Sequence, residues 1–295
     1  MDGILNIYKP SGMTSHDVVE RVRKIMKERR VGHTGTLDPL ATGVLVLCIG
    51  KATRIAQYLE AGEKEYRAVM RLGITTDTLD AEGSVLETKS YVKPGQDEVL
   101  DAMKGFTGRI MQQPPAYSAL KISGVPSYKL AREGRAIPHK LRSVDIFTID
   151  LVSYEDPVIA LFVRCSKGVY IRTLCADLGS KLGMGAHLTE LERTRSGNFT
   201  AKNAIGFDQL MTIVSEGAVE SVLTPIDEAL NGFPLVSVSD SDAMRVLHGN
   251  MIACERALAD TIGIVRLHNP AGKLLALAQH AAGSLRPTLV FPTQT

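Results

Sequence analysis

The segment Gly32–Gly43, which reads GHTGTLDPLATG, constrains the fold of this chain more than any other stretch. Its glycines tolerate positive φ angles and close backbone approach, so the segment is predicted to be a folded loop and not a helix or strand. Pro39 disfavours the helical conformation at Asp38 and holds that residue extended. Such a loop presents the Asp38 carboxylate, with His33 beside it, to a ligand. The alternative is an Asx-type turn in which Asp38 bonds only to local backbone.

Regular patterns on both sides of this segment predict an α+β fold. Thr14 and Asp17 form a helix start signal, and the apolar run Val44–Ile49 is typical of a core strand. Alternation from Tyr66 to Leu72 indicates another strand. Further strands are expected over 3–8, 144–154, 158–165 and 187–194, and helices over 55–59, 99–103, 127–133, 170–182, 207–214 and 221–230. Strands interrupted by helices without strict alternation favour a mixed, largely antiparallel sheet flanked by helices.

The end of the chain predicts a second, smaller domain. Asn231–Pro234 is the best candidate for a linker. Beyond it, the alternating segments Gly263–His268 and Leu274–Ala278 flank a turn, which fits a small β-barrel or half-barrel of about 60 residues. We therefore expect a large domain over residues 1–230 and a small domain over residues 233–295.

Composition argues against several classes of protein. Apolar residues make up 44% of the 295 residues and charged residues 22%, which is ordinary for a globular protein. No apolar run approaches the roughly 18 residues of a membrane span and no secretory signal opens the chain, so a cytoplasmic protein is expected. The cysteines form no C-x-x-C pair, which favours reduced thiols, and the seven histidines show no metal-binding spacing. A metal-free protein is predicted.

Local charge suggests an anionic partner, although the net charge is only +2. One basic run precedes Gly32 and comprises Arg21, Arg23, Lys24, Lys27, Arg29 and Arg30. A second run, over residues 121–143, comprises Lys121, Lys129, Arg132, Arg135, Lys140 and Arg142. Each run alone is explained by a solvated face, but two basic runs in a nearly neutral chain favour a polyanion-binding surface. Because the second run lacks a long apolar stripe, we interpret it as a surface insertion.

Familiar catalytic motifs are absent from the chain. It contains neither G-x-G-x-x-G nor G-x-x-x-x-G-K-[ST], so nucleotide-cofactor folds have no support. It also lacks G-x-S-x-G, and no serine or cysteine lies in a recognisable nucleophile motif. Asp38 is left as the most prominent reactive group.

The segment Gly32–Gly43 resembles the signature loop of the bacterial TruB-type tRNA pseudouridine-55 synthases. Further segments fit the same family in the same order, from about residue 9 to residue 188: KPSG from Lys9, KEY from Lys64, TDT from Thr76, DAEG from Asp80, PAYSALK from Pro115, SKGVYIRT from Ser166 and GAHL from Gly185. Val169 departs from the small polar residue that many members carry there. The last 60 residues match more weakly, at the place where the family usually has an RNA-binding PUA-type barrel.

The resemblance implies isomerisation of uridine 55 in the tRNA T loop to pseudouridine, without a cofactor or metal. It identifies Asp38 as the nucleophile, which attacks either C1′ of the sugar or C6 of the base. Arg172 would pair with Asp38 and keep it ionised, because a nearby cation lowers a carboxylate pKa. Tyr66 would stack on the base and is a candidate for removing the C5 proton.

The resemblance also implies how the RNA is held. Tyr170 and Leu191 would line the uracil pocket, and Lys9 would support the site from beside the substrate. His33 would fill the space left by the flipped-out nucleotide, since the target base is stacked inside the T arm. The basic insertion would clamp the backbone of the T arm, and the enzyme would act as a monomer.

Two other functions compete with this hypothesis. A tRNA-binding or folding factor would use the same surfaces without chemistry, but binding alone needs no carboxylate facing a phosphate-rich partner. A glycoside-cleaving enzyme would need a second catalytic carboxylate. Asp77 and Asp80 are the nearest candidates for it, and we interpret both as turn residues.

Overall fold

The computed structural model describes residues 1–295 except 119, 123, 134–139, 255–262, 282 and 292–295. Packing within the described residues divides the chain into two units, residues 3–223 and residues 224–295. Each unit has its own buried apolar cluster. No helix in the described parts of the chain is long and apolar enough to cross a membrane.

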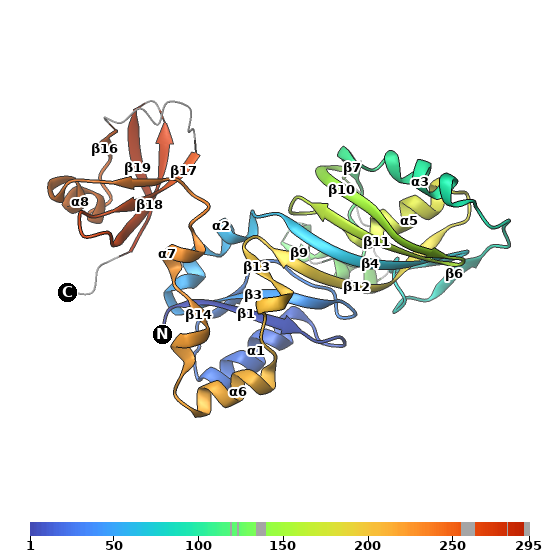
Figure 1. The fold of residues 1–295 in the computed structure, drawn as a ribbon, viewed down its shortest axis with the longest axis horizontal. Coiled ribbons are helices and arrows are strands. Elements are labelled where there is room, and N and C mark those ends of the chain that lie inside the picture. The colour runs from blue at the N-terminus through green and yellow to red at the C-terminus, as the bar shows by residue number, and fades with distance from the viewer. Residues whose placement is uncertain (119, 123, 134–139, 255–262, 282, 292–295) are drawn as a thin grey trace. The chain divides into compact units, whose positions relative to one another are not determined.

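A mixed sheet forms the centre of the first unit (Figure 1). Its strand order is β14-β1-β3-β12-β4-β11-β10-β7, with β2 paired to β3 and β13 to β12. β12 runs parallel to β3, whereas β4, β7, β10 and β11 pair antiparallel with their neighbours, so the predicted α+β class is confirmed. The strands are β1 (Gly3–Lys9), β2 (Val31–His33), β3 (Thr42–Ile49), β4 (Lys64–Leu72), β7 (Gly108–Gln112), β10 (Arg142–Glu155), β11 (Val158–Cys165), β12 (Ala186–Ser196), β13 (Phe199–Thr200) and β14 (Leu223–Thr224).

Helices pack against the two halves of this sheet (Figure 1). α1 lies beside α6 and β2, while α3 and α5 lie over β10, β4 and β12. The predicted start of α1 is confirmed, since Thr14 and Asp17 form a reciprocal capping box. The helices are α1 (Ser15–Met26), α2 (Ala56–Glu60), α3 (Gln96–Lys104), α4 (Ser127–Arg132), α5 (Ile171–Lys181) and α6 (Phe207–Ser215), with 3-10 turns η1 (Gly50–Ile55), η2 (Ala201–Asn203) and η3 (Val219–Val222).

Two sequence-based expectations about regular structure were wrong. The segment Gly32–Gly43 is not a loop throughout, because its ends lie on β2 and β3, which pair with each other. The loop proper spans residues 34–41 and is called the signature loop below. The single helix expected over 221–230 is interrupted, because Pro225 cannot continue a helix and disfavours helical backbone at the residue before it.

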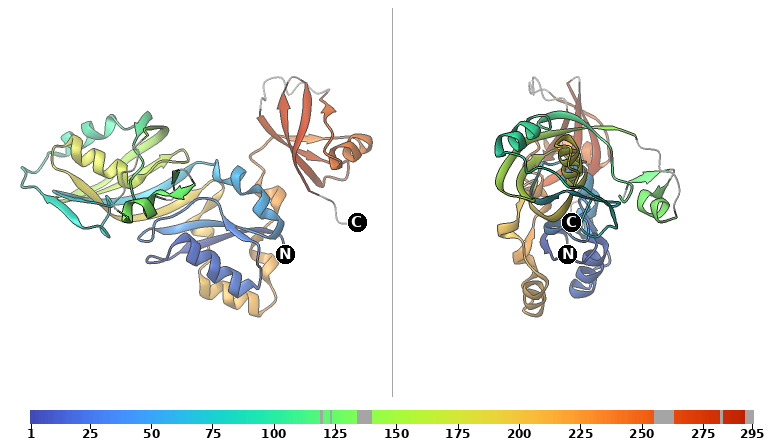
Figure 2. Two further views of the ribbon diagram at one scale, coloured as in Figure 1. Left: turned by 180° about the vertical axis from the view of Figure 1, so that it is seen from behind. Right: turned by 90° about the vertical axis from the view of Figure 1, so that its right-hand side faces the viewer.

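Two small hairpins project from the main sheet of the first unit. β5 (Ile74–Thr76) pairs with β6 (Val85–Thr88). β8 (Lys121–Ile122) pairs with β9 (Val125–Pro126), and α4 follows directly. The segment with β8, β9 and α4 lies in the predicted basic insertion and stands out from the body of the sheet (Figure 2).

The second unit is a five-stranded sheet with one helix against it. Among the described residues the strand order is β15-β17-β18-β19-β16, which fits the predicted PUA-like half-barrel. Asp227 ties the start of the unit to the sheet, because its carboxylate accepts from Arg266 at 2.8 Å and lies 2.9 Å from His268 Nε2. The elements are α7 (Ile226–Ala229), α8 (Asp240–Leu247), β15 (Leu235–Ser237), β16 (Ile252–Ala253), β17 (Gly263–His268), β18 (Leu274–Ala281) and β19 (Ser284–Val290).

Candidate active site

Hydrogen bonds from buried polar side chains hold the signature loop in place. Ser15 Oγ accepts from the Leu37 amide at 2.8 Å and donates to the Leu37 carbonyl at 3.1 Å. Lys9 Nζ donates to the carbonyls of Pro10 at 2.8 Å and Pro39 at 3.0 Å, and its side chain is fully buried. Burial lowers the pKa of Lys9 to about 8. Lys9 therefore supports the loop that carries Asp38 and does not reach the cavity in which a substrate would lie.

A cavity of about 340 Å³ opens beside this loop. Its lining includes the predicted residues Asp38, Tyr66, Tyr170, Arg172 and Leu191, which come from the loop, β4, β12 and the start of α5. The fold thus gathers around one space residues that lie as much as 153 positions apart in the chain. The sequence resemblance placed these side chains in one pocket, and the geometry is compatible with a flat base between them.

One guanidinium joins two carboxylates at the edge of this cavity. Arg172 Nη2 donates to Asp38 Oδ1 at 2.9 Å, and Arg172 Nη1 lies 3.2 Å from Asp80 Oδ2. The same two nitrogens donate to the carbonyls of Thr78 at 3.0 Å and Tyr117 at 2.9 Å. The side chain of Arg172 is 5% exposed, that of Asp80 4% and that of Asp38 30%. Asp38 is therefore the carboxylate that faces the open space.

The interpretation of Asp80 as a plain turn residue was wrong. Asp80 does accept a hydrogen bond from the Glu82 amide within a turn, but its other oxygen fixes the guanidinium of Arg172. The sequence signal was available in the DAEG segment, whose match to the family was noted without a role. Its distance from Arg172 along the chain hid the contact.

Burial, and not Arg172, dominates the titration of Asp38. Loss of solvent raises the pKa of Asp38 above its ordinary value, Arg172 lowers it, and the charge on Asp80 raises it again. Arg172 does lower the pKa of Asp38, as expected, but the net pKa is raised because burial outweighs this effect. A carboxylate made more basic by its surroundings is a better nucleophile once it is ionised.

The start of α5 is clamped by an amide that the sequence analysis did not identify. The Tyr170 amide donates to Gln112 Oε1 at 2.8 Å, and Gln112 Nε2 donates to the Tyr170 carbonyl at 3.0 Å. Gln112 is almost fully buried at the end of β7. This two-way bond positions Tyr170 and, two residues later, Arg172. Gln112 lies outside the motifs that match the family, and nothing in the sequence around it indicated this contact.

Tyr66 and Arg193 line the cavity side by side. Tyr66 is buried on β4, and burial raises the pKa of its hydroxyl. Arg193 lies directly opposite it on β12 and was not identified from the sequence. Leu191, two residues earlier on β12, lines the same cavity.

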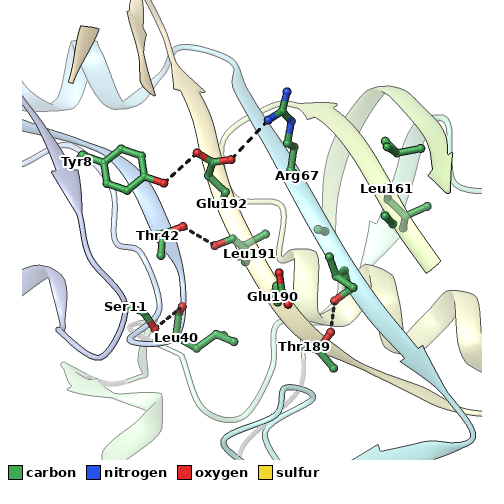
Figure 3. Close-up of a pocket in the computed structure, with 14 residues that line it drawn as sticks. Tyr8, Ser11, Leu40, Thr42, Arg67, Leu161, Thr189, Glu190, Leu191 and Glu192 are labelled. Carbon is green, nitrogen blue, oxygen red and sulfur yellow. Dashed lines mark hydrogen bonds and ion pairs between the residues drawn. The ribbon is translucent and has the colours of Figure 1, made fainter. Parts of the chain in front are cut away.

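A second hollow, of about 550 Å³, lies where β3 and β12 meet and also includes Leu191 (Figure 3). Thr42 Oγ1 donates to the Leu191 carbonyl at 3.4 Å (Figure 3). Nearby, the Tyr8 hydroxyl donates to Glu192 at 3.0 Å (Figure 3). These bonds tie β1, β3 and β12 together at the end of the signature loop, so Leu191 has little freedom to move.

His33 and the described side chains of the basic insertion do not line the cavity. His33 is on β2, its Nδ1 is buried without a partner among the described residues, and it is not part of the cavity lining. Burial lowers its pKa, with the charge of Arg193 as the next cause. Lys129, Lys140 and Arg142 are exposed. The side chains of Lys121 and Arg132 and the whole of Arg135 lie outside the described residues.

Gly43 cannot carry a side chain, because it adopts φ +100° and a Cβ would overlap the backbone of Arg193. We expect Gly43→Ala to lower the free energy of unfolding by about 2–5 kcal/mol, from strain plus overpacking. Gly12→Ala is the matched control, since Gly12 has φ +81° with nothing within 4 Å of the added atom and should lose only about 1–2 kcal/mol. Urea unfolding of both variants measures the difference. Equal losses would contradict the close contact between β3 and β12.

Comparison with known proteins gives consistent matches. The model for the N-terminal domain of the TruB family pseudouridylate synthases matches residues 23–171, and that for the tRNA pseudouridylate synthase B C-terminal domain matches residues 172–231. The chain is 46% identical over 263 residues to tRNA pseudouridine synthase B of Clostridium kluyveri, covering 89% of each. It is 43% identical over 282 residues to the protein of that name from Pseudomonas aeruginosa, covering 95% of this chain and 92% of the relative.

Solved structures with the same fold are similar over nearly the whole chain. One is a chain of an H/ACA RNP bound to a substrate RNA containing 2′-deoxyuridine, with 27% identity and a TM-score of 0.76, covering 99% of this chain and 85% of the other. Another belongs to a Cbf5–Nop10–Gar1 complex, with 28% identity and a TM-score of 0.76, covering 98% of this chain and 84% of the other.

Proposed function

The chain belongs to the TruB family of pseudouridylate synthases and is a tRNA pseudouridine synthase, and from this premise we propose that it acts on uridine 55 of the T loop with Asp38 as its nucleophile. The observation that carries the proposal is the 2.9 Å pair between Asp38 and the buried Arg172, at the mouth of a cavity of about 340 Å³.

The reaction requires breaking the N1–C1′ bond, turning the uracil over, joining C5 to C1′ and moving a proton from C5 to N1. The Asp38 carboxylate begins this sequence by attacking C1′ or C6, and both routes suit a carboxylate in this position. Arg172 aims the carboxylate, because its guanidinium is fixed by Asp80 and two carbonyls. Tyr66 stacks on the base and takes the C5 proton, while Leu191 and Tyr170 confine the ring.

A base stacked inside the T arm must leave the stack to reach Asp38. We assign the space it vacates to His33, whose imidazole lies on the strand leading into the signature loop. We assign the phosphates of the T arm to the basic insertion, in which Lys129, Lys140 and Arg142 are exposed. Both assignments rest on the family resemblance, and the exposure of the three cations supports the second.

Mapping the modified position tests this proposal. Incubated with an unmodified tRNA transcript, the enzyme should convert position 55 and no other uridine, and a T-arm hairpin should serve as well as whole tRNA. Carbodiimide labelling followed by primer extension locates each pseudouridine. A transcript with cytidine at position 55 is the control and should remain unlabelled. Labelling elsewhere with position 55 untouched would contradict the proposed site.

A further inference from the structure

Arg193 occupies the place where the catalytic elements meet. On β12 its backbone lies opposite Gly43 of β3 on one side and opposite Tyr66 of β4 on the other. The strand that follows the signature loop and the strand that carries Tyr66 therefore share this one residue as a neighbour.

The side chain of Arg193 also contacts the signature loop and β3. Its Nε donates to the Val44 carbonyl at 2.8 Å, and its terminal nitrogens donate to the carbonyls of Thr36 at 3.4 Å and Gly35 at 3.2 Å. Arg193 and Tyr66 lie directly opposite each other on β12 and β4, and both side chains line the cavity, so the guanidinium and the phenol share one face of the sheet. Arg193 thus holds the loop that presents Asp38 and lies beside the phenol of Tyr66.

The charge of Arg193 has no acidic partner. The residue is 2% exposed, and no carboxylate of the described residues lies within 4.0 Å of its nitrogens. Burial is the main cause that lowers the pKa values of Lys64 and Lys9 to about 8, and the positive charge of Arg193 adds to both shifts. A buried cation whose partners are all neutral groups lowers the stability of the fold, so its presence here calls for a functional explanation. An anion that forms beside Arg193 only during the reaction would provide that explanation.

We propose that Arg193 is a positioning residue that holds the Tyr66 hydroxyl in place and provides the counter-charge for its phenolate form. The inference rests on the proposed role of Tyr66 as the base at C5. In that step the phenolate takes the C5 hydrogen as a proton, and the electron pair of the C5–H bond re-forms the C5–C6 double bond. At the same time the π pair of the C6–N1 bond moves to N1 or, where Asp38 is bonded to C6, that C–O bond breaks and frees the carboxylate. N1 takes a proton from water, and Tyr66 returns its own to water, so no other reactant is needed.

The groups around Tyr66 support this assignment. Burial raises the pKa of Tyr66, the positive charge of Arg193 lowers it, and the negative charge of Asp38 raises it. Burial also raises the pKa of the Cys165 thiol on β11, to about 12. The other charged groups lining the cavity are Glu60, Lys64, Lys167 and Arg172. Arg193 is the cation on the neighbouring strand directly opposite Tyr66, so its removal should make the phenolate harder to form.

The test uses a T-arm hairpin with tritium at C5 of uridine 55. After a single turnover, we measure how much base is bonded to the sugar through C5 but still carries tritium at C5. This amount rises when proton removal from C5 is slow, even if another step limits the overall reaction. Arg193→Met should slow tritium loss at neutral pH about tenfold or more, because one unit of pKa changes the phenolate fraction tenfold. The rate of tritium loss in Arg193→Met should return toward that of wild type as the pH rises. Arg193→Lys keeps the charge and should lose less.

Three comparisons separate this role from a merely structural one. Arg195→Met is the matched control on the same strand, because Arg195 pairs with Glu65 at 2.7 Å outside the cavity, and its pH profile should match wild type. In a Tyr66→Phe background, Arg193→Met should change tritium loss by less than about twofold, since the group it acts through is absent. If Arg193→Met fails to fold, Arg193→Gln, which keeps a side-chain donor for the loop carbonyls but removes the charge, takes its place.

The outcomes also distinguish this inference from the proposed function. A wild-type enzyme that leaves uridine 55 unchanged would overturn the proposed function. A wild-type enzyme that converts it, together with Arg193 variants whose tritium loss keeps the wild-type pH dependence, would overturn the role of Arg193 alone. Fully additive losses in the Tyr66→Phe background would have the same meaning, because Arg193 would then act only through the loop.

Discussion

Asp38→Asn is expected to reduce pseudouridine formation by about 10⁴-fold or more, the range seen when an enzyme loses its nucleophile or a group that acts with it. The amide is nearly the same shape as the carboxylate, and its oxygen can still accept the hydrogen bond from Arg172 Nη2. The fold and the cavity are therefore kept while the attacking anion is lost. Tritium release from C5-labelled uridine in a T-arm hairpin measures the effect.

Binding of the same hairpin serves as the internal control for this variant. Because binding relies on the cavity walls and on cationic side chains, the affinity should stay close to that of wild type. Asp145→Asn is the matched substitution, since Asp145 pairs with the exposed Arg109, neither residue lines the cavity, and tritium release should be unchanged. Full tritium release by Asp38→Asn would remove Asp38 from the nucleophile's role and leave the chemistry to another group.

Local signals in the sequence were sufficient for most of the fold. Thr14 and Asp17 mark the start of α1, and alternation correctly places Tyr66 on a strand with its side chain buried. Pro225 was a visible signal too, but the helical pattern around it was given more weight, which predicted one continuous helix where the structure has a 3-10 turn and a separate short helix. Local patterns therefore work where one feature dominates, and fail where two compete.

The inward position of Arg193 was beyond such patterns. Strict alternation from Leu188 would place Glu190 and Glu192 beside it on the buried face and turn Arg193 outward. A register shift between Leu188 and Glu190 reverses this, so Leu191 and Arg193 face the cavity instead. The bulge depends on how β12 pairs with β4, which is a long-range property. The resemblance named the cavity residues that belong to its motifs, but not the buried side chains that hold them.

Arg172→Met is expected to lower the free energy of unfolding by about 3–5 kcal/mol, because it leaves a buried carboxylate without its partner. Asp80 is almost fully buried and would lose the guanidinium at 3.2 Å, while the carbonyls of Thr78 and Tyr117 would lose their donors. Asp38 would lose its aim at the same time, so tritium release should also collapse. Urea unfolding and the hairpin assay measure the two effects separately.

Two further variants make this prediction specific. Arg67→Met removes a guanidinium whose side chain is 73% exposed and lies 4.0 Å from Glu192, so its unfolding curve should match that of wild type. Adding Asp80→Asn to Arg172→Met removes the stranded charge and should recover part of the lost stability but none of the activity, because stability depends on neutralising Asp80 whereas catalysis depends on orienting Asp38. An Arg172→Met variant as stable as wild type would mean that Asp80 is protonated or solvated in the folded protein, and the guanidinium would then not be what holds the two carboxylates together.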